Sequence, residues 1–178
     1  VCGSAIYANI TVTFISMKPG LLTHQGTEYS GEIILRNLDI NTSTLIEPQS
    51  WVLDLPYIQQ LLPPPRPANS HKGIFGSVGI IGGSAGMTGA ALLAGTAALK
   101  LGSGRVYLGL ITENILTFSP VQPELMFRSP HELFKLDHLN CLVIGPGLGM
   151  SADAYSWLDC ALKSTQSLVL DADALNLI

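Results

Sequence analysis

The sequence predicts an α/β fold in which a mostly parallel sheet carries helices on both faces. From His71 to Ile178, short apolar strand-like runs alternate with helix-like runs, which is the pattern of a parallel sheet covered on both sides. Hydrophobic residues make up 47% of the chain and charged residues 12%, about half the charged share of a typical soluble domain. Elements buried on several sides, or apolar surface covered by partner subunits, would explain this composition. We therefore also expect a homo-oligomer.

The first zone, residues 1–44, is predicted to contain two strands. Thr11–Ser16 is rich in β-branched and aromatic residues and is stopped by Lys18-Pro19-Gly20. Glu32–Leu38 is a second strand-like run and is followed by turn-forming residues.

Residues 45–70 are predicted to form a proline-rich linker between domains. The run Leu61-Leu62-Pro63-Pro64-Pro65-Arg66-Pro67 excludes helix and central strand and favours an extended polyproline segment. A proline-rich ligand for SH3-type domains is the alternative interpretation.

Residues 71–178 carry the alternation of strands and helices. The predicted strands are Ser77–Ile81, Arg105–Ile111, Asn140–Ile144 and Ser167–Leu170, and the predicted helices are Met87–Leu101 and Ala152–Leu162. Gly102 and Gly104 end the first helix, whose many alanines and glycines allow it to lie close to the sheet.

Charge and composition exclude several classes of function. The net charge of −4 and the scattered lysines and arginines argue against a nucleic-acid surface. The uncharged stretch Gly82–Leu99 has the glycines and periodicity of a loop entering a buried helix, so we expect no membrane segment. Three cysteines without CxxC spacing indicate buried, reduced thiols in a cytoplasmic protein. The four histidines show no metal-ligand spacing.

Three of the predicted strands end in unusual residues. Gly82–Gly86 follows the first strand, Gly145–Gly149 the third, and Asp171–Asp173 the fourth. Carboxyl ends of parallel strands meet at one edge of a sheet, where ligands bind. Glycines there allow a phosphate to approach the backbone and a helix N-terminus, and the aspartates could hold Mg²⁺ or ribose hydroxyls. Asp173 also fits the N-cap of a following helix.

Two familiar nucleotide motifs do not fit this pattern. The P-loop sequence GxxxxGK[ST] does not occur. The glycines Gly83, Gly86 and Gly89 are spaced differently from the GxGxxG of dinucleotide-binding dehydrogenases. The sequence therefore predicts a nucleotide-type site of another kind.

Five motifs in order resemble the NAD(P)H-hydrate dehydratase family, which has a ribokinase-like fold. They are His71-Lys72-Gly73, Gly82-Gly83-Ser84-x-Gly86-Met87-x-Gly89-Ala90, Pro123-Glu124-Leu125-Met126, Gly145-Pro146-Gly147-Leu148-Gly149 and Asp171-Ala172-Asp173-Ala174-Leu175-Asn176. The resemblance covers residues 71–178 and implies the N-terminal part of a ribokinase-like domain.

The first zone resembles the end of a different domain, the Rossmann-like α/β NAD(P)H-hydrate epimerase. The resemblance lies in Ala8–Phe14 and Lys18–Thr23. It implies that Thr11 coordinates K⁺ and that Asn9 stands where the family usually has a substrate-binding Asp. Bacterial proteins of this type fuse the epimerase in front of the dehydratase, with a linker between the two.

The resemblance implies an enzyme that repairs hydrated NADH and NADPH by removing water while ADP, or ATP, is consumed with Mg²⁺. It implies that Ala90 and Gly149 contact the hydrated dinucleotide. The remaining residues of the implied sites are Gly83, Ser84, Gly86, Gly147 and Lys72 at the substrate and Asp171, Asp173 and Asn176 at the nucleotide or Mg²⁺. The catalytic Asp and the ADP pocket are expected after Ile178, and the catalytic residues of the epimerase before Val1.

Two alternatives remain open at this point. A small-molecule kinase of the same fold, acting on a sugar or hydroxymethylpyrimidine, is disfavoured by the GGSAGMTGAA and DADALN motifs. The chain could also be a non-catalytic binding or assembly piece.

Overall fold

The computed structural model describes residues 3–62, 64–112 and 117–178 and divides into two compact units. Unit 1 spans Val1–Pro65 and unit 2 spans Arg66–Ile178. The division falls inside the segment predicted as a linker.

Unit 1 contains two parallel strands, β1 (Ile10–Phe14) and β2 (Glu32–Arg36). The short helices α1 (Pro19–Leu22) and α2 (Gly26–Tyr29) connect them, and a 3₁₀ turn, η1 (Thr42–Thr44), follows. Both strands end two residues before their predicted ends. Ile15 and Leu38 adopt positive φ angles of 71° and 55°, which a strand cannot accommodate.

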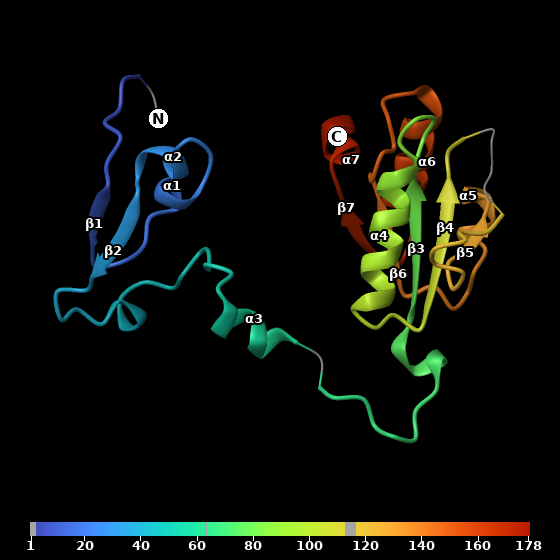
Figure 1. Ribbon diagram of the computed structural model, residues 1–178, viewed down its shortest axis with the longest axis horizontal. Coiled ribbons are helices and arrows are strands. Elements are labelled where there is room, and N and C mark those ends of the chain that lie inside the picture. Colours follow the sequence, from blue (N-terminus) through green and yellow to red (C-terminus); the bar gives the residue numbers. More distant parts are fainter. Residues whose placement is uncertain (1–2, 63, 113–116) are drawn as a thin grey trace. The chain divides into compact units, whose positions relative to one another are not determined.

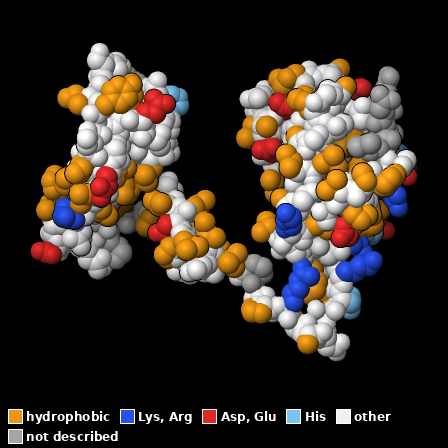
Figure 2. Space-filling view, in the orientation of Figure 1, with side chains coloured by type: hydrophobic (Ala, Val, Ile, Leu, Met, Phe, Trp, Pro, Cys, Tyr) orange, Lys and Arg blue, Asp and Glu red, His pale blue; other side chains and the backbone are white. Residues whose placement is uncertain are grey.

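Unit 1 exposes many apolar side chains. Ile6, Tyr7 and Ile10 are 87%, 69% and 56% exposed, and Figure 2 shows hydrophobic side chains gathered on this unit. Two strands alone cannot bury such residues, because a stable sheet needs more strands or a covering helix.

The predicted linker contains a helix, α3 (Leu55–Leu61), which the sequence analysis missed. Asp54 caps it by accepting a hydrogen bond from the Tyr57 N–H at 2.9 Å. Pro56 is accommodated in the first turn, where a backbone N–H would have no partner within the helix. The helix ends before the proline run. Pro63 lies outside the described residues.

Unit 2 is built on a five-stranded, all-parallel sheet in the order β5-β4-β3-β6-β7 (Figure 1). The strands are β3 (Ser77–Gly82), β4 (Arg105–Leu110), β5 (Met126–Arg128), β6 (Cys141–Ile144) and β7 (Ser167–Leu170). The predicted α/β fold is confirmed. The sequence analysis missed β5, which begins at the last residue of the PELM motif.

The helices of unit 2 cover both faces of the sheet. They are η2 (Lys72–Phe75, 3₁₀), α4 (Thr88–Lys100), α5 (Pro130–Leu133), α6 (Ala152–Leu162) and α7 (Asp173–Leu177). Ile80 and Ile81 are both fully buried but belong to different core clusters. Ile80 packs in the cluster of α4, and Ile81 in the cluster of α5, α6 and α7, because successive strand residues point to opposite faces.

Helix α4 lies close to the sheet, as its small residues predicted. A Cβ at Gly95 would lie 2.9 Å from Leu125 and 3.0 Å from Leu108. Leu125, in the PELM motif, is therefore the buried contact that the glycine accommodates. The helix ends where predicted, at Gly102, which adopts a φ of +107°.

The cysteines and helices bear on two further predictions. Cys141 is half-buried, and burial raises the pKa of its thiol. Cys160 is exposed on α6, so the prediction of buried thiols is wrong there, and Cys2 lies outside the described residues. Within the described ranges, no helix is long and apolar enough to cross a membrane.

Candidate functional site at the carboxyl edge of the sheet

The order of the strands places a topological switch point between β3 and β6. The chain enters unit 2 at the central strand β3, continues to β4 and β5 on one side, and then passes to β6 and β7 on the other. The loops that leave β3 and β6 therefore start at neighbouring strand ends and lead to helices on opposite faces of the sheet. In open parallel sheets, ligands bind outside the carboxyl ends of the strands at this switch point.

The two glycine-rich loops meet at this point. The Gly83 N–H donates to the Pro146 carbonyl at 2.9 Å, and the Ser84 N–H donates to the Gly147 carbonyl at 2.7 Å. A Cβ on Gly82 would overlap the Pro146 carbonyl oxygen. Glycine at position 82 is thus required by the close approach of the two backbones.

The start of α4 completes the contact with the second loop. A Cβ on Gly147 would lie 2.6 Å from the Met87 carbonyl oxygen and 3.1 Å from the Ala90 Cβ. A Cβ on Gly149 would lie 3.2 Å from the Ser84 hydroxyl oxygen. Five of the predicted substrate residues therefore form one cluster of contacts: Gly83, Ser84, Ala90, Gly147 and Gly149. Its surface is formed by Ser84, Ala90 and Gly149, which are partly exposed, whereas Gly83 and Gly147 are buried.

Gly86 lies at the turn before α4 and borders this surface. It is exposed and adopts a φ of +82°, and a Cβ there would meet no atom within 4 Å. The backbone conformation, and not lack of space, therefore explains glycine at this position.

The residues after β7 contact the same edge. The Asp171 N–H donates to the Ile144 carbonyl at 3.0 Å, and a Cβ on Gly145 would overlap the Asp171 carbonyl oxygen. The Asp173 carboxylate accepts a hydrogen bond from the Gly149 N–H at 2.8 Å. Asp171 and Asn176 are exposed, and Asp173 is partly buried.

The prediction that Asp173 caps a helix is wrong. Ala172 is the N-cap of α7, and Asp173 is the first residue of the helix. The side chain of Asp173 reaches the loop after β6 instead of its own helix. Ala172 adopts the unfavourable angles φ 38° and ψ −104° at this turn.

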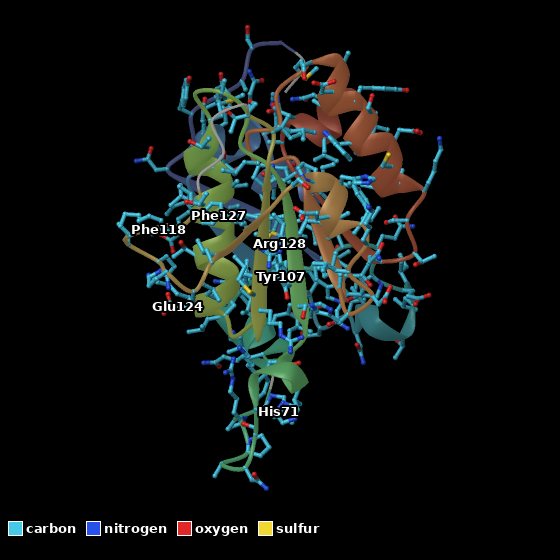
Figure 3. The ribbon with its side chains drawn as sticks, turned by 90° about the vertical axis from the view of Figure 1, so that its right-hand side faces the viewer. His71, Tyr107, Phe118, Glu124, Phe127 and Arg128 are labelled. Atoms are coloured by element: carbon cyan, nitrogen blue, oxygen red, sulfur yellow. The ribbon has the colours of Figure 1, made fainter. Side chains whose placement is uncertain are left out.

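Lys72 does not belong to this surface. It lies in η2, before β3 begins, and a Cβ on Gly104 at the start of β4 would overlap the Lys72 carbonyl oxygen. Figure 3 shows His71, the preceding residue, at the end of unit 2 where β3 starts. The six residues of β3 separate Lys72 from the glycine loops by about 20 Å. This separation does not support the predicted contact between Lys72 and substrate phosphate.

Sequence reasoning also missed groups at this edge. The Met87 backbone contacts Gly147. Arg128 ends β5 on the same edge, and its guanidinium donates to the Phe127 carbonyl at 3.0 Å (Figure 3). Ser129 and Glu132 form a capping box at α5, and the S-x-x-E spacing could have revealed it. The Ser129 N–H, its hydroxyl and the nearby Arg128 lower the pKa of Glu132.

The oxygen donors at the edge suit a hard cation only in part. Asp171 and Asp173 supply carboxylates, which Mg²⁺ prefers. Among the residues that the structure describes, no group of three or more His, Cys, Asp or Glu side chains is arranged to hold a metal. An ion bound here would need ligands from a nucleotide or water.

Comparison with known proteins agrees with this geometry. The family model for NAD(P)H-hydrate dehydratase matches residues 78–178. A Coxiella burnetii protein, "Bifunctional NAD(P)H-hydrate repair enzyme Nnr", is 39% identical over 185 residues, which cover 99% of this chain and 37% of that protein. The chain thus spans well under half the length of this relative.

Two solved structures share the fold of unit 2. One is an ADP/ATP-dependent NAD(P)H-hydrate dehydratase of Bacillus subtilis co-crystallised with ATP and Mg²⁺, 33% identical, with a TM-score of 0.55 over 65% of this chain and 44% of that chain. The other is a ribokinase-like superfamily protein of Enterococcus faecalis, 30% identical, with a TM-score of 0.55 over 64% and 42% of the two chains. The predicted ribokinase-like fold is confirmed. With glycine loops at the switch point and a family match over most of unit 2, this chain belongs to the NAD(P)H-hydrate dehydratase family.

Proposed function

We propose that the protein containing this chain removes water from hydrated NADH and NADPH, with ADP or ATP as the co-substrate. The observation that carries the proposal is the cluster of Gly83, Ser84, Ala90, Gly147 and Gly149 at the switch point, where Ser84, Ala90 and Gly149 are partly exposed. The small size of the partly exposed Ser84, Ala90 and Gly149 leaves room for the close approach of a dinucleotide. The Bacillus subtilis relative is named as a dehydratase of this type.

The chemistry requires a phosphorylated intermediate. Hydroxide is a poor leaving group from the nicotinamide ring, so transfer of the terminal phosphoryl group of ADP to the ring hydroxyl produces AMP and a better leaving group. Breaking of the C–O bond releases phosphate, and loss of a proton from the neighbouring ring carbon forms the double bond of the dihydronicotinamide. Such catalysis depends mostly on positioning and on stabilisation of charge.

The residues of this chain would supply the substrate side of the site. Ala90 and Gly149 would contact the hydrated dinucleotide, with Gly83, Ser84, Gly86 and Gly147 around them. Asp171 and Asn176 would border the nucleotide, and the exposed carboxylate of Asp171 would contribute to a Mg²⁺ ion held largely by phosphate oxygens. The ion would neutralise the charge of the phosphates.

For residues 1–44 we propose the end of an epimerase domain, followed by a linker over residues 45–70 and the dehydratase domain from residue 71. The Coxiella burnetii alignment, which includes unit 1, supports this organisation. The Thr11 hydroxyl donates to the Ser30 carbonyl at 2.6 Å, and both oxygens are suitable ligands for K⁺. The Asn9 carbonyl oxygen accepts from the Glu32 N–H at 2.9 Å, while its exposed amide would bind substrate in place of a carboxylate.

We further propose a cytoplasmic homo-oligomer without a nucleic-acid or membrane partner. The net charge is −4, and Leu93 in α4 and Leu101 directly after it are 73% and 78% exposed. Light scattering coupled to size-exclusion chromatography tests the oligomer. A monomer at micromolar concentration would contradict it.

The dehydratase test uses the full-length protein with hydrated NADPH, ADP and Mg²⁺, followed by the recovery of absorbance at 340 nm. Ala90→Leu should raise the KM for the hydrated dinucleotide, whereas Ala97→Leu, on the exposed side of the same helix, should leave it unchanged. No recovery by the wild type, together with phosphate transfer to a sugar or hydroxymethylpyrimidine, would establish the kinase alternative instead.

A further inference from the structure

Asp173 makes a hydrogen bond that links two separate parts of the candidate site. Its Oδ2 accepts from the Gly149 N–H at 2.8 Å, across 24 residues of sequence. The bond joins the first residue of α7 to the loop that follows β6. Bonds between a carboxylate and a backbone N–H are stronger than those between neutral groups.

The backbone around Asp173 holds the carboxylate in this position. Ala172 adopts φ 38° and ψ −104°, and the Ala174 N–H donates to the Asp171 carbonyl at 2.9 Å. The Asp171 backbone is in close contact with Gly145 at the start of the other loop. A conformation unfavourable for alanine persists only where surrounding contacts impose it. The turn therefore fixes Asp173 against the loop.

Gly149 is the residue whose orientation this bond controls. It has a φ of +75°, and its Cα faces the Ser84 side chain and Met87. Among the described residues, the buried Leu148 side chain anchors the preceding residue, and Asp173 supplies the side-chain hydrogen bond that holds the Gly149 N–H. The N–H of Gly149 is also withdrawn from any ligand.

We propose that Asp173 is a positioning residue that orients Gly149 toward the substrate, and not a ligand of Mg²⁺ or of the nucleotide. The inference rests on the proposed function only for the part that concerns the substrate. A positioning role requires a hydrogen-bond acceptor at one place, whereas a metal or charge role requires the negative charge. These requirements can be separated by substitution.

Asp173→Asn keeps an acceptor oxygen in the same place and removes the charge. Asp173→Glu keeps the charge and moves the carboxylate by one methylene. Positioning predicts that Asn is tolerated better than Glu, and a metal or charge role predicts the reverse order. Asp173→Ala removes both features, and Asp153→Asn on the exposed start of α6 is the matched control for charge.

The first measurement is hydrogen exchange of the Gly149 amide in the full-length protein, by mass spectrometry of peptides around residue 149. Asp173→Ala removes this hydrogen bond, so the Gly149 amide should exchange about tenfold faster than in the wild type. Asp173→Asn and Asp153→Asn should stay within about threefold of the wild type. Equal exchange in the wild type and Asp173→Ala would overturn the proposal even if no enzymatic activity is found.

The second measurement is steady-state kinetics with hydrated NADPH and ADP. Asp173→Ala and Asp173→Glu should raise the KM for the hydrated dinucleotide about tenfold, with smaller changes in the KM for ADP. A loss in Asp173→Asn larger than that in Asp173→Glu, or a shifted Mg²⁺ requirement, would overturn the positioning role. An inactive wild type would refute the proposed function and leave the exchange experiment to decide the hydrogen bond.

Discussion

Gly145→Ala provides a test of how closely the ends of β6 and β7 approach each other. Gly145 follows β6 directly and has a φ of +129°, a conformation that side-chain-bearing residues rarely adopt. Its added methyl group would also overlap the backbone of Asp171. The substitution therefore combines a conformational cost with a steric cost.

The magnitude follows from these two costs. Backbone strain of this kind costs about 1–3 kcal/mol, and overpacking against a rigid neighbour costs about 1–3 kcal/mol more. We expect a loss of about 2–6 kcal/mol, which is a large fraction of the 5–15 kcal/mol that typically stabilise a domain. Two other glycines provide graded controls.

Gly86→Ala isolates the conformational cost, since its φ is +82° but its surroundings are open. It should lose about 1–2 kcal/mol. Gly89→Ala has neither a positive φ nor a neighbour within 4 Å and lies in α4. It should be neutral or stabilising by up to about 1 kcal/mol.

The assay is urea unfolding followed by tryptophan fluorescence in a Trp51→Phe background, so that Trp157 reports on unit 2 alone. Trp157 stacks on Phe134 with ring centroids 6.0 Å apart, and unfolding separates the rings. Equal losses for the substitutions at Gly145 and Gly86 would refute the close contact between the Gly145 and Asp171 backbones.

Two further predictions concern the ends of other elements. Arg66→Ala removes a guanidinium that lies 4.0 Å from the Phe75 ring centroid and donates to the Gly102 carbonyl. Because exposed cation–π contacts contribute about 0.5–1 kcal/mol, amide exchange in residues 66–76 should rise about two- to fivefold, and unchanged exchange would contradict the contact. The Ser129 N–H lowers the pKa of Glu132, so the stabilisation by Glu132 is complete above its unfolded-state pKa and is lost as the pH falls through its folded-state pKa. Urea midpoints of the wild type and Glu132→Gln should therefore differ at about pH 7 and converge as the pH falls through the folded-state pKa of Glu132, and a gap that widens in acid would contradict this.

The elements of unit 2 that have clear capping or turn residues at their ends could be predicted from the sequence. The bounds of α6 and β7 match their prediction, because Ser151 caps the helix through the Ala154 N–H and Asp171 follows a continuous apolar run. The carboxyl-edge cluster was predicted for the same reason. Its glycines and aspartates directly follow apolar strands, and parallel strands end on one side of the sheet.

The elements that depend on distant contacts were missed. β5 has three residues and no periodic pattern, and it exists because Met126–Arg128 pairs with β4. Lys72 was assigned to the substrate through the family resemblance, as a charge that could counter phosphate. The six residues of β3 nevertheless separate Lys72 from the glycine loops, because they run from one edge of the sheet to the opposite edge. The role of Asp173 depends on Gly149, and no local pattern reveals a bond across the sheet edge.

The glycines of the candidate site have two different physical roles, which sequence alone cannot separate. At Gly82 and Gly145 the space that a side chain would need is filled by the backbone of the neighbouring loop or turn. Those glycines bring the strand ends together and cannot themselves admit a ligand. At Gly86 and Gly89 the same space is open. A ligand that approaches the backbone should therefore do so over the start of α4, between this open stretch and Gly149, and substitutions there should impair binding more than folding.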